Sequence, residues 1–311
     1  MANVGQTSNI VIERNALWFA AVTSLTWGLT GVFVRLLPPI PPLTITAGRL
    51  VIAMVAVLPI LLFIRDTQHS VKSALRYPVS YALALLLAGY YFLATAAFQM
   101  APVAEVALLL STPPLFVLAI RKIRGKPSSH AEIGGAILAI SGIAIILVPR
   151  ISFARDHSSQ HLYGDIIAIC AAALTAIYAY TYRVLAVNGR SPESTGVSLL
   201  TFAIGGVSLA LAVTLRATPS GISTLDNSAV LVFLGLGILS TAVPSLGFAI
   251  ASRRLPAIIT AMISLFIPLF SGLFAFLILG ERLSIMFLVG CAFVLLGVAM
   301  IIRNNRARTS D

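Results

Sequence analysis

Two charged residues, Arg49 and Glu105, stand inside long apolar stretches of this sequence. A charge within the hydrocarbon of a membrane is costly, usually faces the protein interior, and either pairs with another charge or marks a transport path. With a helical rise of about 1.5 Å per residue, both charges lie at a similar depth from the same side. Three interpretations stay open: a structural Arg49–Glu105 pair, a substrate-carboxylate site at Arg49, and a proton site at Glu105.

Further polar residues recur at steps of three, four and seven along several apolar stretches, so each set shares one helix face. Lipid offers such a face no partners, and we therefore expect it to point into a cavity. Membrane hydroxyls also join helices, at about 0.6 kcal/mol each, and about half of these residues are assigned to that structural role. The residues predicted to bind substrate are Trp27, Thr30, Arg49, Tyr90, Tyr91, Thr95, Thr112, Tyr178 and Ser264. Glu105 is the predicted coupling residue.

Prolines interrupt two apolar stretches at corresponding places in the two halves of the chain, and Pro113, Pro114 and Pro268 are predicted to kink their helices. A prolyl ring removes a backbone donor and clashes with the preceding turn. In lipid, the freed carbonyls need partners from neighbouring helices, hydroxyls or cavity water. Paired interruptions of this kind point to a transporter binding site. A kink that serves packing alone is the alternative.

No other pattern with catalytic chemistry is visible. The sequence has no Ser/His/Asp set, metal-ligand spacing, Walker loop or nucleotide site. We therefore predict no enzymatic activity, no cofactor, no metal and no nucleotide partner. All four histidines fall in predicted loops, and Cys170 and Cys291 stand singly in apolar stretches, as small hydrophobes do.

The composition identifies the solvent for which the chain is built. Of 311 residues, 59% are hydrophobic and only 10% are charged, with a mean hydropathy of +0.99. Soluble domains carry about 25% charged residues. This chain cannot cover itself with a polar surface, so it must fold in a bilayer.

A bilayer core about 30 Å thick needs about 20 apolar residues of helix. Ten stretches qualify, which predicts an all-α integral membrane protein with ten transmembrane helices. The stretches cover about 16–37, 43–64, 79–98, 101–120, 133–148, 164–185, 195–215, 229–251, 257–279 and 283–302. Two helix starts carry capping signals, the Ser129–Glu132 capping box and Ser191-Pro192.

The two halves of the chain repeat each other. Gly125, Ser129, Gly135 and Gly142 recur 155 residues later, and Pro102 and Pro114 recur 154 residues later. With five helices in each half, the second copy enters the membrane from the opposite side. This predicts two inverted five-helix repeats around a central cavity. The predicted segments are a cytoplasmic N-terminal segment (1–15), the first repeat (16–148), an outer connecting loop (149–163), the second repeat (164–302) and a basic tail (303–311).

The net charge of +11 is largely a topology signal. Fifteen of the 21 Lys and Arg residues fall on one side when the N-terminus is placed in the cytoplasm. Basic loops mark the cytoplasmic side, so both termini are predicted to be cytoplasmic in a bacterial-type inner membrane. This placement argues against a nucleic-acid partner.

Taken together, these residues resemble the drug/metabolite transporter superfamily of the EamA type. The residues that carry the resemblance are Trp27-Gly28, Arg49 with Ala53, Gly164-Asp165, the run from Phe248 to Ala257, Pro268, Gly280-Glu281-Arg282-Leu283 and Gly290. The resemblance covers nearly the whole chain and implies a ten-helix carrier with a central cavity that exports amino acids or other small metabolites. The first half departs from the pattern, because Lys126-Pro127 stands where the second half has Gly280-Glu281.

The expected function is a secondary transporter of small organic molecules, an exporter working by alternating access, with protons as a candidate coupling ion. Its partners are a small-molecule substrate and membrane lipids, and the sequence leaves the oligomeric state open. Uptake or uncoupled exchange by the same fold is one alternative. A membrane-embedded enzyme or a lipid-handling scaffold is another.

Overall fold

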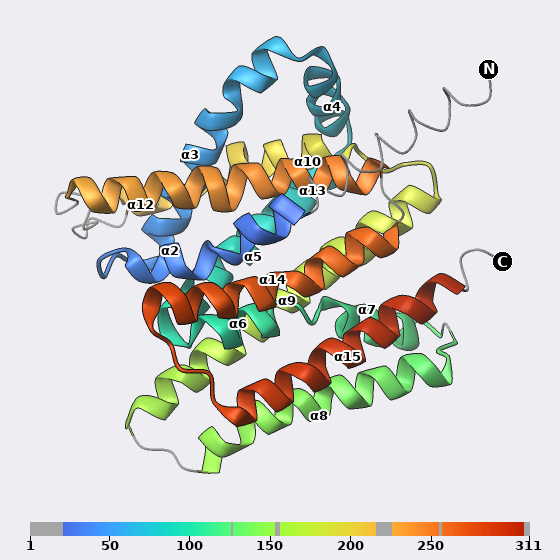
Figure 1. Ribbon diagram of the computed structural model, residues 1–311. Coiled ribbons are helices and arrows are strands. Elements are labelled where there is room, and N and C mark those ends of the chain that lie inside the picture. Colours follow the sequence, from blue (N-terminus) through green and yellow to red (C-terminus); the bar gives the residue numbers. More distant parts are fainter. Residues whose placement is uncertain (1–20, 126, 153–155, 216–225, 255–256, 308–311) are drawn as a thin grey trace, which may run out of the picture.

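The computed structural model describes the chain except residues 1–20, 126, 153–155, 216–225, 255–256 and 308–311. Within the described part the fold is all-helical, as predicted, and the long helices run side by side in a bundle (Figure 1). Eight helices are long and apolar enough to span a membrane: α3 (Pro42–Phe63), α5 (Val79–Met100), α6–α7 (Val103–Ile123), α8 (His130–Ser152), α9 (Asp156–Val187), the helix from Ser194 to Leu215, the helix from Asn227 to Arg254, and α15 (Ile285–Ala307). Two shorter apolar helices stand where the first and ninth spans were expected, Ala21–Leu36 and Leu265–Leu279.

The first short helix ends in α2 (Thr30–Leu36), and the second is the C-terminal part of α14 (Ala257–Leu279). Two of the spanning helices are composite, because a π-helical turn interrupts each one. They are α10 (Ser194–Leu200), η1 (Thr201–Gly205) and α11 (Gly206–Leu215), and α12 (Asn227–Gly237), η3 (Ile238–Ala242) and α13 (Val243–Arg254). The hydrophobic pattern did not predict either turn.

Several boundaries differ from those expected. An additional helix, α4 (Arg65–Arg76), lies between α3 and α5. The segment 149–163, expected as an outer loop, is helical on both sides of residues 153–155, since α8 extends to Ser152 and α9 begins at Asp156. Ser191-Pro192 precedes α10 rather than opening it, and Glu193 takes the N-cap position.

The stretch with two adjacent prolines is divided into two helices. α6 (Val103–Leu109) ends before a turn at Leu110–Thr112, and Pro113 and Pro114 open α7 (Pro113–Ile123). Proline is favourable there, because the first turn of a helix has no use for its missing donor. Pro268, by contrast, lies inside the continuous helix α14.

Equivalent residues in the two halves have the same structural roles. Gly125 and Gly280 end α7 and α14 with φ of 70° and 66°, a left-handed conformation that glycine adopts without strain. Ser129 accepts from the Glu132 amide at 3.1 Å before α8, and Ser284 accepts from the Phe287 amide at 3.0 Å before α15. Each half therefore ends on the same sequence of turn, cap and helix.

The Ser129–Glu132 capping box is confirmed. The Glu132 carboxylate accepts in return from the Ser129 amide at 2.9 Å. Its other oxygen pairs with Arg121 at 2.7 Å, which ties the end of α7 to the start of α8. Glu132 is fully buried, so these partners satisfy a carboxylate that has no access to water.

Helices α8 and α15 run side by side (Figure 1) and pack closely at glycines, a contact that we call the α8–α15 crossing. A Cβ at Gly135 would stand 2.7 Å from the Gly297 carbonyl oxygen, and a Cβ at Gly142 would stand 2.6 Å from the Gly290 carbonyl oxygen. Because Gly135 corresponds to Gly290 and Gly142 to Gly297, the same contact is made twice with the halves exchanged. Backbones approach this closely in membranes where small residues line the crossing.

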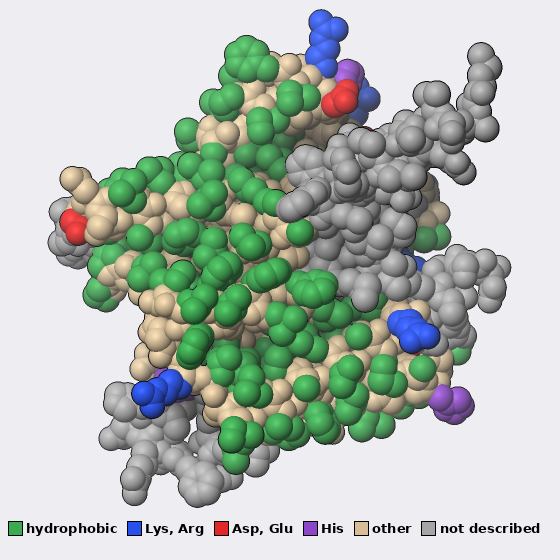
Figure 2. All heavy atoms as spheres, in the orientation of Figure 1, with side chains coloured by type: hydrophobic (Ala, Val, Ile, Leu, Met, Phe, Trp, Pro, Cys, Tyr) green, Lys and Arg blue, Asp and Glu red, His purple; other side chains and the backbone are tan. Residues whose placement is uncertain are grey.

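The outside of the bundle is apolar, as lipid contact requires. Figure 2 shows hydrophobic side chains covering the middle of the visible face, with charged groups near its margins. Large apolar residues such as Leu85, Val207, Leu231 and Phe276 are exposed along the spanning helices. A water-soluble protein rarely exposes an apolar surface of this extent.

Candidate functional site

Arg49 lies in the interior of the bundle, on α3, and only 1% of the residue is exposed. Its Nε donates to the Thr241 hydroxyl at 2.9 Å, and its Nη2 donates to the Ser240 carbonyl oxygen at 3.2 Å. Its Nη1 lies 3.5 Å from the Thr95 hydroxyl, and the guanidinium carbon sits 4.9 Å from the centre of the Tyr91 ring. These residues form what we call the Arg49 site.

The π-helical turn η3 supplies two of the groups that hold Arg49. Thr241 donates its hydroxyl proton to the Leu236 carbonyl at 2.8 Å, which leaves its oxygen free to accept from Arg49. π-Helical turns are rare and are frequent at functional sites. The turn is pressed onto α3, since a Cβ at Gly237 would stand 3.2 Å from the Arg49 carbonyl oxygen.

A second layer of hydrogen bonds orients these groups and joins four helices. Ser240 donates to the Thr26 carbonyl at 3.0 Å, which connects η3 to the first helix. The Tyr91 and Ser245 hydroxyls lie 3.0 Å apart, and Thr95 donates to the Tyr91 carbonyl at 2.8 Å. The Arg49 site is thus built jointly by helices of the N-terminal half and of the C-terminal half.

The contacts of Arg49 within the described residues are hydroxyls, a carbonyl oxygen and an aromatic face, all of them neutral. The expected alternative of an Arg49–Glu105 pair is not formed, because the guanidinium of Arg49 makes the contacts described above instead. Similar depth in two helices was a poor guide, because it leaves open which way each side chain points. A guanidinium carries five N–H donors and suits a carboxylate bidentately. The arrangement is suited to receive an anion.

The remaining predicted residues are distributed over several places. Trp27 is half-buried, with its ring 5.6 Å from that of Phe248, and the Tyr90 ring lies 5.4 Å from that of Tyr91. The Thr30 hydroxyl is buried with no hydrogen-bond partner among the described residues. The side chain of Ser264 lies outside the described part of the chain.

Two predicted residues serve other local structures. Tyr178 stacks with Tyr182 at 5.9 Å and packs with a separate apolar cluster that includes Ala74. Thr112 donates to the Leu109 carbonyl at 2.6 Å within the turn between α6 and α7. Of the residues predicted to bind substrate, the structure brings Arg49, Tyr91 and Thr95 together.

Ser240, Thr241 and Ser245 belong to the site and were missed. The signal was present, since these hydroxyls and Pro244 interrupt the apolar run 229–251. The three residues are not all three or four positions apart, because the π-helical turn changes the spacing of residues that share one helix face.

Glu105 lies away from this arrangement, at a pocket near one end of the bundle. The pocket, of about 610 Å³, is lined by Arg35, Pro102, Ala104, Glu105, His161, Leu279, Glu281, Arg282, Leu283, Ser284 and Phe287. Both Glu281 oxygens accept from the Val103 amide, at 3.0 and 3.2 Å, so a loop of the second half caps α6 of the first. Glu281 is therefore a helix cap.

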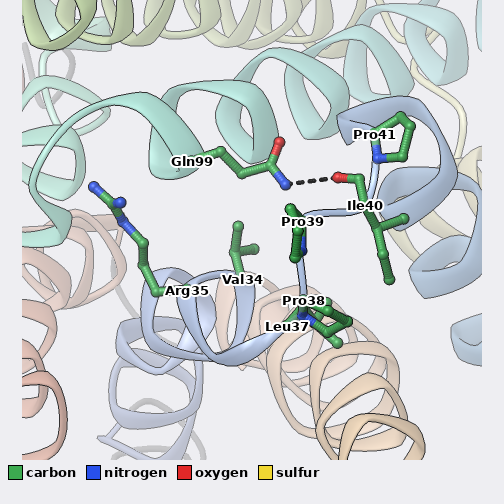
Figure 3. A pocket seen from close by; sticks show the side chains of 8 residues that line it. All are labelled: Val34, Arg35, Leu37, Pro38, Pro39, Ile40, Pro41 and Gln99. Atoms are coloured by element: carbon green, nitrogen blue, oxygen red, sulfur yellow. Dashed lines mark hydrogen bonds between the residues drawn. The ribbon is translucent and has the colours of Figure 1, made fainter. Parts of the chain in front are cut away.

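Arg35 also lines an adjoining pocket of about 550 Å³, in which Gln99 donates to the Ile40 carbonyl at 2.9 Å (Figure 3). In Figure 3 the Arg35 side chain points along the pocket from α2 toward α5, opposite the Pro38–Pro41 segment. The guanidinium donates to the Ala101 carbonyl at 2.8 Å. Both pockets lie at the end of the bundle where α2 and α5 end.

The model of the EamA-like transporter family matches residues 14–148 and 162–303. The chain belongs to this family. It is therefore a multi-pass membrane transporter and not an enzyme, and membership implies a small-molecule substrate and lipid surroundings. The two matched segments coincide with the halves that repeat each other in sequence.

Two relatives of this EamA-like transporter bear on fold and function. The chain is 26% identical over 211 residues to a "Probable terminal-alkyne amino-acid exporter" of Streptantibioticus cattleyicolor, covering 68% of this chain and 67% of that protein. A protein crystal structure matches with a TM-score of 0.63 and 21% sequence identity, covering 96% of this chain and 99% of that chain. The second match shows the fold alone.

Proposed function

We propose that this EamA-like transporter is a secondary exporter of amino acids or similar small carboxylates, and that Arg49 binds the substrate carboxylate. The observation that carries the proposal is the fully buried guanidinium with neutral partners among the described residues. Insertion scales give a cost of about 2.5–3.5 kcal/mol for arginine at the centre of a membrane helix. A bound substrate anion would offset that cost by pairing with the guanidinium. Because a neutral ligand would leave the charge unpaired, Arg49 favours substrates that carry a carboxylate.

The transport cycle we infer is alternating access between two inverted five-helix repeats, which makes ten spanning helices. Two features support it. The α8–α15 crossing makes the same glycine contact twice with the halves exchanged. In addition, the Tyr91 hydroxyl contacts that of Ser245, and the two residues are 154 positions apart, which is one of the spacings of the sequence repeat. The Arg49 site draws groups from both halves, so a rocking motion of one half against the other opens and closes it.

We place both termini on the cytoplasmic side of a bacterial-type inner membrane, following the basic loops. The two pockets at Arg35 then face outward, where an exporter releases its substrate. We take the export direction from the relative that is named as an amino-acid exporter. Glu105, at the outer pocket, is the residue we assign to proton coupling, because intramembrane acids mark proton relays.

The test measures thermal stabilisation of the purified protein by propargylglycine, an amino acid with a terminal alkyne, and by common amino acids. A ligand at a concentration of 100 Kd stabilises the native state by about 2.7 kcal/mol. The amide and methyl ester of propargylglycine lack the carboxylate and should give no shift. If ester and acid stabilise equally, Arg49 does not bind a carboxylate.

Substitution of Arg49 sharpens the test. Arg49→Gln should remove the shift and leave the free protein at least as stable as wild type, because it deletes an uncompensated buried charge. Arg190→Gln, at an exposed cation outside the site, is the matched control and should keep the full shift. Collapse of free Arg49→Gln with an intact Arg190→Gln would assign Arg49 a structural role instead.

A further inference from the structure

Helix α4 carries its basic residues on one narrow stripe. Arg65, His69, Lys72 and Arg76 follow one another at steps of four, three and four, and all are exposed. At 3.6 residues per turn, the four positions fall within an arc of about 60°. We call these residues the basic stripe. The helix has a single acid, Asp66.

The opposite face of α4 is fixed to the protein. Thr67, Ser70 and Ala74 are buried. The Ser70 hydroxyl donates to the Glu193 carboxylate at 2.7 Å, and α10 approaches so closely that a Cβ at Gly196 would strike the Ser70 carbonyl. The basic stripe therefore points directly away from the bundle.

The two flanks of the basic stripe differ in polarity. On one side Leu75, which is half-exposed, lies about 80° around the helix beside Gln68, whose amide donates to the Leu62 carbonyl at 2.9 Å; on the other, Asp66 and Ser73 lie about 80–100° around. The flank with Leu75 is suited to hydrocarbon and the flank with Asp66 to water. The basic stripe between them lies at the level of lipid headgroups, as in helices that rest in the membrane interface.

The corner between α3 and α4 extends this interfacial surface. Leu62, Phe63 and Ile64 are exposed there, Phe63 to 84%. In Figure 1, α4 lies across the end of the bundle instead of running along it, directly after the spanning helix α3. Figure 2 shows charged and histidine side chains gathered at this corner beside a green apolar surface. The helix thus lies where a bilayer surface must be.

We propose that the basic stripe of α4 binds the headgroups of anionic phospholipids. Two arginines and a lysine face outward with one acid on the helix, and basic residues on a helix beside a spanning segment are attracted to anionic lipid. Each such residue contributes about a fivefold factor in affinity near an anionic surface. The proposal goes beyond the transport function and does not depend on it.

The bound lipid would also hold the elements that build the Arg49 site. α4 follows α3, which carries Arg49, and its buried face contacts α10, which leads into the π-helical turn η1. Anionic lipid on the basic stripe therefore anchors this corner between the two halves. We expect it to raise the thermal stability of the full chain.

The experiment places a bimane fluorophore at Leu75→Cys, with Cys170 and Cys291 replaced by alanine, in the full chain reconstituted in nanodiscs. Spin-labelled phosphatidylglycerol or spin-labelled phosphatidylcholine is the quencher. The proposal requires at least tenfold stronger quenching, per mole of lipid, by phosphatidylglycerol. The triple variant Arg65→Gln, Lys72→Gln and Arg76→Gln should lose that preference, since three fivefold factors are on the order of a hundredfold.

The matched control removes the same charge elsewhere on the same side, with Lys122→Gln, Arg183→Gln and Arg190→Gln, all at exposed positions. It should keep the preference for phosphatidylglycerol. Equal quenching by both lipids in the unmodified chain would overturn the proposal, as would equal loss in both triple variants. Absence of quenching by either lipid would place α4 in water and favour a soluble acidic partner.

Discussion

The crossing of α8 and α15 yields a quantitative prediction, because α8 contains two adjacent glycines in opposite surroundings. An alanine methyl at Gly135 would stand 2.7 Å from the Gly297 carbonyl oxygen and 3.0 Å from Met300 Cβ. At Gly134, nothing lies within 4 Å of a new methyl. Both substitutions gain about the same helix propensity, up to about 1 kcal/mol. The difference between their free energies of unfolding therefore measures the steric cost of the methyl group at the crossing.

We expect Gly135→Ala to be less stable than Gly134→Ala by about 1–3 kcal/mol, the usual cost of overpacking. The new methyl meets backbone, which cannot rotate away as a side chain can. Denaturant unfolding of the two purified variants in the same detergent measures the difference. Gly290→Ala should cost a similar amount, since its methyl would stand 2.7 Å from the Gly142 carbonyl oxygen. Equal stability of Gly134→Ala and Gly135→Ala would refute the close crossing.

Four further outcomes are expected. Glu132→Ala should destabilise the protein by about 1–3 kcal/mol in thermal or denaturant unfolding, because it removes a helix cap and the ion pair with Arg121. Glu105→Gln should fold and bind substrate but lose the dependence of reconstituted flux on a pH gradient, and flux that follows the gradient as in wild type would exclude the proton site. Replacing Pro114 and Pro268 together by alanine should leave folding intact and lower the flux in proteoliposomes, whereas wild-type flux would show that these prolines serve packing alone. The backbone amide of Ala229 and the Ser228 hydroxyl donate to the Asp226 carboxylate and lower its pKa. The stabilisation from Asp226 is therefore present above the unfolded pKa of about 4 and is lost as the pH falls through the folded pKa. Asp226→Asn should accordingly reduce the loss of stability that wild type shows at acid pH.

The sequence predicted the helical membrane fold and part of the site, for a reason that can be stated physically. Apolar length and composition alone decide what enters a bilayer, so eight of the ten expected spans coincide with helices that are long and apolar enough to cross one. Helix periodicity placed Tyr91 and Thr95 on one inward face, and the cost of a charge in lipid placed Arg49 in the interior, where the structure has all three in contact. One-dimensional spacing is enough for these features.

The features that were missed depend on relations that spacing does not contain. The partners of Arg49 come from residues 240 and 241, about 190 positions away, through a π-helical turn that alters the local period. Helix α4 is polar overall, so a search for apolar runs passes over it, although its basic and buried positions alternate at a helical step. The Arg49–Glu105 pairing failed because depth along a helix says nothing about direction around it.

The glycine crossing has a consequence for how such a chain can arise. A contact that is made twice with the two partners exchanged is self-complementary, as in a closed dimer of identical subunits. The glycines of the crossing correspond between the halves, since Gly135 and Gly142 have their counterparts in Gly290 and Gly297. In the inverted arrangement that we propose, two copies of a single half-length chain, inserted in opposite directions, would meet through the same surface. Joining the copies by a linker then adds only the freedom for each half to diverge, as Lys126 and Glu281 already have in the sequence, directly after the equivalent Gly125 and Gly280.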